Sequence, residues 1–219
     1  MRYWMILSAL ALTACALPPV RDAARVHFFE VAARIEPVAE AQCRDERPNA
    51  NCDFLIRIDP SHQTMPNAYQ GLDRDGRPVL TVTRGLLKNI RTEDELAFVL
   101  AHEAAHHIRG HLELKHQHAA QGAAHLGAAV SRLGGSQAEI ENAQALGAIV
   151  GGRSYSKAFE LEADALGTVI THLAGYSPRL GLAFFEQVPD PGDQFLGSHP
   201  ANPDRIRTVE YTISALGLE

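Results

Sequence analysis

The stretch from Glu95 to His107 limits the folds open to this chain more than any other part of the sequence. Because a helix turns by about 100° per residue, His102 and His106 would lie on one helical face and could offer two imidazole nitrogens to one metal ion. Glu103 would flank that site, where a carboxylate that does not bind the metal can take a proton from the attacking water. The pattern is typical of zinc peptidases, and a third ligand must then come from elsewhere. A polar helix face rich in histidine by chance is the alternative.

The residues around this motif predict where its helix begins. Thr92 and Glu95 form a capping box, and acidic residues in the first turn suit the positive end of the helix dipole. We expect the helix to continue past Gly110 toward Gln121. In one regular helix the later histidines would lie roughly opposite His102, which predicts a solvated stripe, with an accessory metal-binding or pH-sensing surface as the alternative. These histidines are His107, His111, His118 and His125.

The first residues have the pattern of a bacterial lipoprotein signal. Arg2 precedes an apolar run, and the segment Leu12 to Cys15 resembles the box at which a signal peptide is cleaved before a lipidated cysteine. An ordinary secretory signal with an incidental cysteine is the alternative. Ala16, in place of an acidic residue, favours sorting to the outer membrane. We therefore expect lipidation of Cys15 and a periplasmic, lipid-anchored protein of the bacterial cell envelope, at the outer membrane.

This signal divides the chain into a lipoprotein signal peptide at 1–14, a lipid-anchored tether at 15–22 and a single domain at 23–219. The formal net charge is −6 and the sequence has no basic run, which argues against nucleic acid as a partner. No long apolar run follows Cys15, so we expect the membrane to be reached through lipid alone.

Two further cysteines, Cys43 and Cys52, remain after the lipidation site. An oxidising compartment outside the cytoplasm favours a disulfide between them. A second metal site is the weaker alternative, because no other cysteine or histidine lies near them at ligand spacing. We expect a structural bridge.

Hydrophobic patterns and turn residues predict a mainly helical chain with a small sheet of about three strands. Two strands are expected at 54–58 and 78–83. The Ala- and Gly-rich segment 119–152 would form a helical hairpin against the core, or alternatively a mobile lid or membrane-facing flap. Further helices are expected at 23–42 with a kink at Pro37, and at 85–90, 156–174, 177–188 and 202–216, with a loop at 189–202.

Candidates for the third metal ligand lie on the predicted helix at 156–174. Glu160 and Asp164 share one face, whereas Glu162 is turned away by about 200°. One of the two could complete a three-ligand zinc site. The other could accept a hydrogen bond from the free ring N–H of a ligand histidine and hold its tautomer. Spacing alone does not assign these two roles.

The ordered motifs resemble those of a known group of enzymes. HEAAH at 102–106, followed by ELEADALG at 160–167, resembles the gluzincin family of HtpX, Oma and BepA, which is metallopeptidase family forty-eight. The resemblance covers roughly residues 54–215 and includes Asn67-Ala68 before a strand, the run 83–87, the run 93–103, and Ser198-His199-Pro200 with Arg205 beyond.

The resemblance implies a mainly helical α+β zincin-like domain, with a small sheet and an active-site helix. One zinc ion per chain would be bound by His102, His106 and Glu160, with Glu103 as general base and acid. Asp164 and Arg205 would support the ligands. His199 would occupy the fourth zinc position at rest or stabilise the tetrahedral intermediate, and a loop histidine before a rigid proline is its alternative.

These expectations predict a zinc endopeptidase that hydrolyses misfolded or unassembled envelope proteins in periplasmic quality control. An extended substrate would add a strand to the edge of the sheet. One alternative is a non-catalytic, chaperone-like lipoprotein that binds zinc. Another is a latent peptidase, gated by the His199 loop and activated by a regulatory envelope partner.

Overall fold

The computed structural model describes residues 20–61, 65–154, 156–187 and 201–218. The predicted signal peptide, Cys15 and His199 lie outside these ranges. Within them the mainly helical α+β class with a small sheet is confirmed. The helices are α1 Val20–Glu46, α2 Arg84–Leu87, α3 Glu93–Ile108, α4 His111–Arg132, α5 Gln137–Ser154, α6 Ser156–Leu173, α7 Pro178–Gly181, α8 Ala183–Gln187 and α9 Asn202–Leu216, and the strands are β1 Leu55–Ile58, β2 Ala68–Leu72 and β3 Pro78–Val82.

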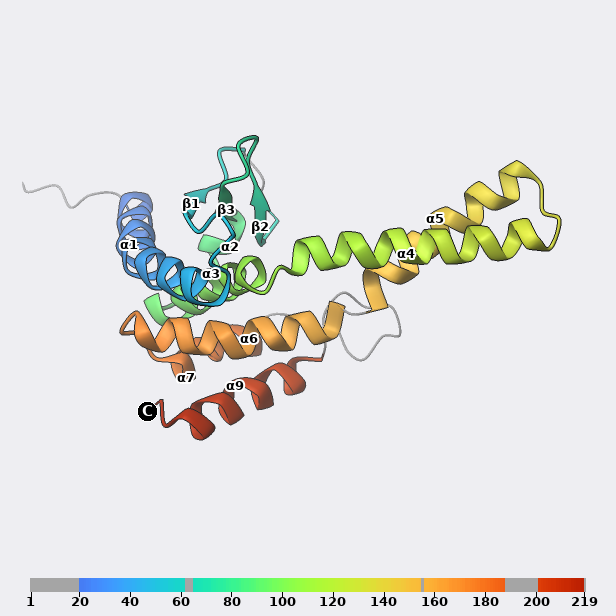
Figure 1. Cartoon of the computed structure of the whole chain (residues 1–219). Helices are drawn as coiled ribbons and strands as arrows, with labels where there is room; N and C mark the ends of the chain where they lie inside the picture. Colours follow the sequence, from blue (N-terminus) through green and yellow to red (C-terminus); the bar gives the residue numbers. More distant parts are fainter. Residues whose placement is uncertain (1–19, 62–64, 155, 188–200, 219) are drawn as a thin grey trace, which may run out of the picture.

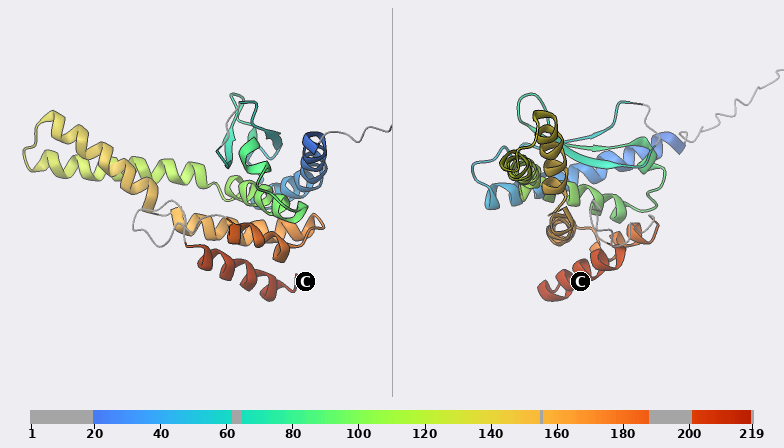
Figure 2. Two further views of the ribbon diagram at one scale, coloured as in Figure 1. Left: turned by 180° about the vertical axis from the view of Figure 1, so that it is seen from behind. Right: turned by 90° about the vertical axis from the view of Figure 1, so that its right-hand side faces the viewer.

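Helix α3 lies at the centre of the body (Figure 1). The sheet and α1 pack on one side of it, α6 packs on the other, and α9 lies beyond α6 (Figures 1 and 2). The main core joins side chains from all of these layers except α9, among them Phe28, Leu80, Leu100 and Ile170, and all four are fully buried. The motif helix is therefore held from both sides by packed apolar residues.

The sheet has the strand order β1-β3-β2, so β1 and β2 are its edges. β1 runs parallel to β3, and β2 runs antiparallel to β3. The turn between β2 and β3 is held by Asp73, whose Oδ1 accepts hydrogen bonds from the backbone N–H of Asp75 at 2.9 Å and of Arg77 at 2.9 Å. Gly76 takes a φ of 78° in this turn, a conformation that favours glycine.

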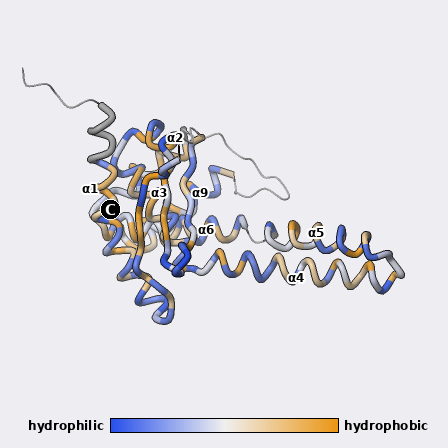
Figure 3. Tube along the Cα trace, turned by 90° about the horizontal axis from the view of Figure 1, so that it is seen from above, coloured by the Kyte–Doolittle hydropathy of each residue, from blue (hydrophilic) through white to orange (hydrophobic). Residues whose placement is uncertain are grey.

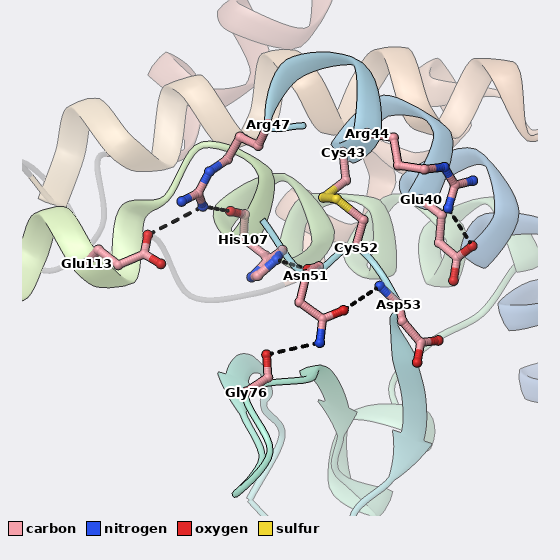
Figure 4. The surroundings of a disulfide bond; sticks show 10 residues. All are labelled: Glu40, Cys43, Arg44, Arg47, Asn51, Cys52, Asp53, Gly76, His107 and Glu113. Atoms are coloured by element: carbon pink, nitrogen blue, oxygen red, sulfur yellow. Dashed lines mark hydrogen bonds and ion pairs between the residues drawn. A yellow bond between two sulfur atoms is a disulfide. The ribbon is translucent and has the colours of Figure 1, made fainter. Parts of the chain in front are cut away.

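Helix α1 differs at both ends from the predicted helix at 23–42. It begins at Val20, so residues 20–22 are helical, and it continues unbroken through Pro37 to Glu46. The predicted disulfide is present: Cys43 in the last turn of α1 is bonded to Cys52, with their Cα atoms 5.6 Å apart (Figure 4).

The prediction of one helix running past Gly110 is wrong. α3 ends at Ile108, Gly110 takes a φ of 69°, and α4 begins at His111 in a new direction. The left-handed glycine ends the helix because no Cβ opposes that conformation. Arg47 stabilises the break, since its Nη1 donates to the carbonyl of His107 at 2.9 Å (Figure 4).

Helices α4 and α5 form the predicted hairpin, but it does not lie against the core. It projects from the body, with polar and apolar segments alternating along both helices (Figures 1 and 3). Glycines let the two helices touch along their backbones: a Cβ on Gly122 would lie 2.1 Å from the carbonyl oxygen of Gly147. The small residues are thus used between the two helices and not against the core. None of the helices in the described ranges has the length and apolarity needed to cross a membrane.

The remaining elements follow the sequence closely, with two exceptions. The predicted helix at 85–90 is the single turn α2, and the predicted helix at 177–188 is divided into α7 and α8. α7 packs on α3 through Gly181, where a Cβ would lie 2.7 Å from that of Phe98. α7 is therefore packed closely against α3, one turn before His102.

Candidate metal centre

The beginning of α3 is held by the predicted cap. Thr92 Oγ1 accepts a hydrogen bond from the N–H of Glu95 at 3.2 Å, and Glu95 Oε2 accepts one from the N–H of Arg91 at 2.8 Å. Three acidic residues occupy the first turn, where the helix dipole is positive. Nearly every residue from Glu95 to Ile108 is buried, so the histidine motif sits on a rigid, well-packed helix.

Three side chains converge at one point between α3 and α6. The Nε2 atoms of His102 and His106 lie 3.0 Å apart. Glu160 Oε1 is 3.3 Å from His106 Nε2, and Glu160 Oε2 is 3.5 Å from His102 Nε2. Two zinc bonds of about 2.1 Å at a tetrahedral angle would place their ligand atoms about 3.4 Å apart. The observed separations and the donor set fit a metal ion, so this group could hold one.

Glu160 reaches the histidines because α6 runs very close to α3. Gly167 faces the backbone of His102, where an added Cβ would lie 3.1 Å from the His102 nitrogen. A larger residue would push the two helices apart. The glycine of the ELEADALG segment therefore has a packing role in bringing the carboxylate to the imidazoles.

Asp164 lies one turn beyond Glu160 and contacts the other side of His102. His102 Nδ1 donates to Asp164 Oδ1 at 2.9 Å. Arg205, on α9, grips the same carboxylate in a bidentate pair, with Nη2 2.6 Å from Oδ1 and Nε 2.7 Å from Oδ2. With His102 Nδ1 held in this way, the ring is fixed with its Nε2 directed at the converging group.

The charges in this group depend on one another. Burial opposes the ionised form of Asp164, but the hydrogen bonds from Arg205 and His102 outweigh it and lower the pKa of Asp164. Burial likewise opposes the charged imidazole, yet hydrogen bonds to Asp164 and Glu160 raise the pKa of His102 to about 9. The Arg205 guanidinium also lies 4.2 Å over the ring centre of Phe185, which holds it in place.

Glu103 lies next to His102 on α3 and is half-buried. It makes no hydrogen bond or ion pair with any residue that the structure describes. Within the described ranges its carboxylate is therefore available beside the converging group to accept a proton. The structure thus brings together all the predicted site residues on α3, α6 and α9.

His111 belongs to this site, although sequence reasoning placed it on a solvated stripe. It is buried, with Nδ1 2.9 Å from His106 Nδ1 and Nε2 3.2 Å from Glu162 Oε2. Burial, together with the nearby His106, lowers the pKa of His111 to about 4. The positive φ of Gly110 turns His111 back toward the motif, so Gly110 was the signal that could have revealed it.

The stripe prediction is also wrong for His107. This side chain is buried, its Nε2 lies 2.8 Å from the carbonyl oxygen of Asn51, and burial lowers its pKa. His118 is half-buried near Phe159, and of the four histidines in the predicted stripe only His125 is exposed as expected. The histidines after the motif therefore have separate roles, because the helix that would have aligned them is broken at Gly110.

Comparison with known proteins agrees with this geometry. Residues 30–213 match the model of Peptidase family M48. The chain is also 32% identical over 136 residues to a Vibrio cholerae protein named as a beta-barrel assembly-enhancing protease. That match covers 56% of this chain and 28% of the relative, so the chain spans much less than the relative's full length. Because the family model covers most of the sequence, the chain belongs to Peptidase family M48, a family of zinc metallopeptidases, and is a metalloprotease.

Proposed function

We propose that this chain is a zinc endopeptidase that degrades misfolded or unassembled proteins of the bacterial cell envelope, held at the membrane by a lipid on Cys15. The observation that carries the proposal is the convergence of His102, His106 and Glu160, with the carboxylate-bearing Glu103 next to His102 on the same helix. Three protein ligands leave one position for water and substrate, which is the arrangement of catalytic rather than structural zinc sites.

The proposed mechanism divides the work among the residues of the site. Zinc held by His102, His106 and Glu160 would polarise the scissile carbonyl and lower the pKa of a water molecule toward about 7. Glu103 takes the proton from the attacking water and delivers it to the leaving amine. Asp164 holds the His102 ring with Nε2 directed at the site. Arg205 keeps Asp164 ionised, and so maintains that orientation.

An extended substrate is proposed to pair with β2. This strand is an edge of the sheet, and no described strand pairs with its outer side, so its outer N–H and C=O groups could pair with another strand. Gln70 and Leu72 of β2 lie close to His106. Backbone pairing here would carry the scissile bond past the site with little dependence on side chains, and only unfolded chains can extend in this way.

The catalytic part of the proposal is tested with Glu103→Gln. The variant should bind about one zinc per chain like the wild type, and cleave unfolded casein about 10²- to 10⁴-fold more slowly, because a general acid–base is lost. Glu141→Gln, an exposed glutamate on α5, is the matched control and should keep full activity. A chelator should abolish cleavage and added zinc should restore it. Full activity in Glu103→Gln would refute the mechanism.

The substrate part is tested by comparing one protein in two states. Cleavage should be fast for a reduced, unfolded outer-membrane protein and slow for the same protein folded in detergent. Equal rates for both states would count against a role in quality control. This result would leave the zinc chemistry intact, so the two parts can be judged separately.

Two observations support the proposed location. The Cys43–Cys52 disulfide suits an oxidising compartment, and the Vibrio cholerae relative is named for enhancing beta-barrel assembly. Cells labelled with radioactive palmitate should incorporate it into the wild type and not into Cys15→Ser, which should also leave the membrane fraction. Label retained by Cys15→Ser would overturn the lipid anchor.

A further inference from the structure

Each of the three carboxylates of α6 contacts at least one histidine side chain. Glu160 approaches both motif histidines, and Asp164 accepts a hydrogen bond from His102. Glu162 points to the opposite side, toward α4, where its Oε2 lies 3.2 Å from His111 Nε2. Only the first two are explained by the roles proposed above, which leaves the Glu162–His111 pair without a function.

The hydrogen bonds through His111 form a chain with one consistent direction. His106 faces the candidate metal group through Nε2, so its proton is on Nδ1 and is donated to His111 Nδ1 at 2.9 Å. His111 must then carry its own proton on Nε2, which it donates to Glu162. Every ring nitrogen in the chain has one defined role, and the carboxylate stands at its end.

The surroundings of His111 hold its ring in this orientation. Its ring stacks on Phe159 with centroids 4.5 Å apart and an interplanar angle of 14°. The residue is only 4% exposed, whereas the Glu162 side chain is 55% exposed. His111 also directly follows the left-handed Gly110, so the backbone break sets where the ring points. The ring is thus fixed by stacking, burial and the break between α3 and α4.

We propose that His111 is a positioning residue for the zinc ligand His106, and that Glu162 orients His111 in turn. The two ligand histidines would then be supported differently: His102 directly by a buried carboxylate, and His106 through a second imidazole that ends at an exposed one. The proposal rests on the proposed function only in taking His106 as a zinc ligand. Hydrogen bonds to the free nitrogen of a ligand histidine fix its tautomer and strengthen its hold on the metal.

Two substitutions separate this role from simple packing. His111→Phe keeps a planar ring to stack on Phe159 but removes the acceptor for the His106 N–H. His111→Asn removes the stacking ring, yet its Oδ1 stands near the former Nδ1 position and can accept the same hydrogen bond. A packing role predicts that the asparagine is worse than the phenylalanine, whereas a positioning role predicts the reverse.

The experiment measures zinc dissociation constants by competition with a chromophoric chelator at pH 7.5, on the full mature chain with folding checked by circular dichroism. We expect His111→Phe to weaken zinc binding about 10- to 100-fold, and His111→Asn to recover most of the affinity. Glu162→Ala, which is one step further from the metal, should weaken binding about 3- to 10-fold. His125→Phe on the same helix is exposed and should have no effect.

Cobalt substitution supplies a second readout. The visible ligand-field bands of the Co²⁺ protein should shift in His111→Phe and Glu162→Ala and stay unchanged in His125→Phe. Wild-type zinc affinity in a folded His111→Phe would overturn the proposal, as would a greater loss in His111→Asn than in His111→Phe. If His111→Phe does not fold, Glu162→Ala provides the test, because Glu162 is exposed and its substitution should not disturb folding. Wild-type zinc affinity in Glu162→Ala would show that Glu162 does not orient His111.

These outcomes are independent of proteolysis. A protein that binds zinc in this manner but cleaves nothing would refute the proposed function and leave the role of His111 standing. If the wild type cleaves as proposed but His111→Phe binds zinc with wild-type affinity, the proposed function stands and the role of His111 is refuted.

Discussion

At the scale of single residues, the site depends on balanced buried charge. Asp164 is fully buried and ionised, and Arg205 supplies its guanidinium from a helix far along the chain. A buried ion pair adds little to stability in itself, but losing one partner leaves an uncompensated charge in a medium of low dielectric constant. The pair is therefore sensitive to any single substitution.

Arg205→Met should lower the free energy of unfolding by about 3–5 kcal/mol, because Asp164 would keep only His102 as a partner. Urea unfolding of the metal-free protein measures this loss. The double variant Asp164→Asn with Arg205→Met removes both charges and should recover a large part of the stability. A loss below about 1 kcal/mol in Arg205→Met would contradict the assignment of a buried ion pair.

At the scale of elements, the α4–α5 hairpin is built on backbone contact between helices. Gly122, Gly147 and Gly151 lie where the helices touch, and a Cβ on any of them would overlap a backbone atom of the other helix. The neighbouring Gly152 has ordinary room, with the nearest atom, the Ala119 Cβ, at 3.5 Å. Two adjacent glycines of α5 therefore differ in whether a side chain can be added without a clash.

Gly151→Ala should destabilise the hairpin by about 1–3 kcal/mol, because its Cβ would lie 2.1 Å from the carbonyl oxygen of His118. Gly152→Ala is the matched control and should stabilise α5 by about 0.5–1 kcal/mol through its helix propensity. Hydrogen exchange of the α4 and α5 amides measures both effects locally. Equal protection in the two variants would show that the helices do not touch at Gly151.

The first turn of α5 provides a prediction about pH. Ser136 donates to Glu139 through both its hydroxyl and its backbone N–H, at 2.7 and 2.8 Å, and these bonds lower the pKa of Glu139. Because the pKa of Glu139 is lower in the folded protein than in the unfolded chain, the cap stabilises α5 fully at a pH above the unfolded pKa. This stabilisation is lost as the pH falls through the folded pKa. NMR titration should find the Glu139 pKa below the usual glutamate range, and Ser136→Ala should bring it back. An unchanged pKa in Ser136→Ala would contradict the cap.

At the scale of the whole molecule, α1 is tied to the sheet at its C-terminal end. Cys43 and Cys52 are both buried, and the bond joins the last turn of α1 to the chain just before β1. The same region contacts the break between α3 and α4 through Arg47. Its Nη1 lies 3.4 Å from Glu113 Oε2 and also donates a hydrogen bond to the carbonyl of His107 (Figure 4). The disulfide thus supports the corner from which the hairpin leaves the body.

Reduction of this disulfide should lower the free energy of unfolding by about 2.5–3 kcal/mol, the cost expected for opening a loop of about ten residues. Denaturant unfolding with and without reductant measures the difference. The double variant Cys43→Ala with Cys52→Ala is the control, because reductant should no longer change its stability. A wild type that is insensitive to reductant would show that the bond does not form in solution.

Local sequence alone determined much of this protein. The cap at Thr92, the spacing of His102 and His106, and the shared face of Glu160 and Asp164 are set by hydrogen bonds and helical period within a few residues. The same is true of the Asp73–Arg77 turn and of Ser136 at the start of α5. These features could be predicted because the interactions that create them span less than two turns of the chain.

Tertiary structure decided what each of these side chains faces. The direction in which α4 leaves Gly110 brought His111 to His106, and the packing of α6 on α3 through Gly167 assigned Glu160 to the converging group and Asp164 to His102. The glycines of α4 and α5 pack against the other helix of the hairpin and not against the core. Such choices depend on contacts between segments distant in the sequence, and a single left-handed residue can redirect every element after it, which helical periodicity cannot express.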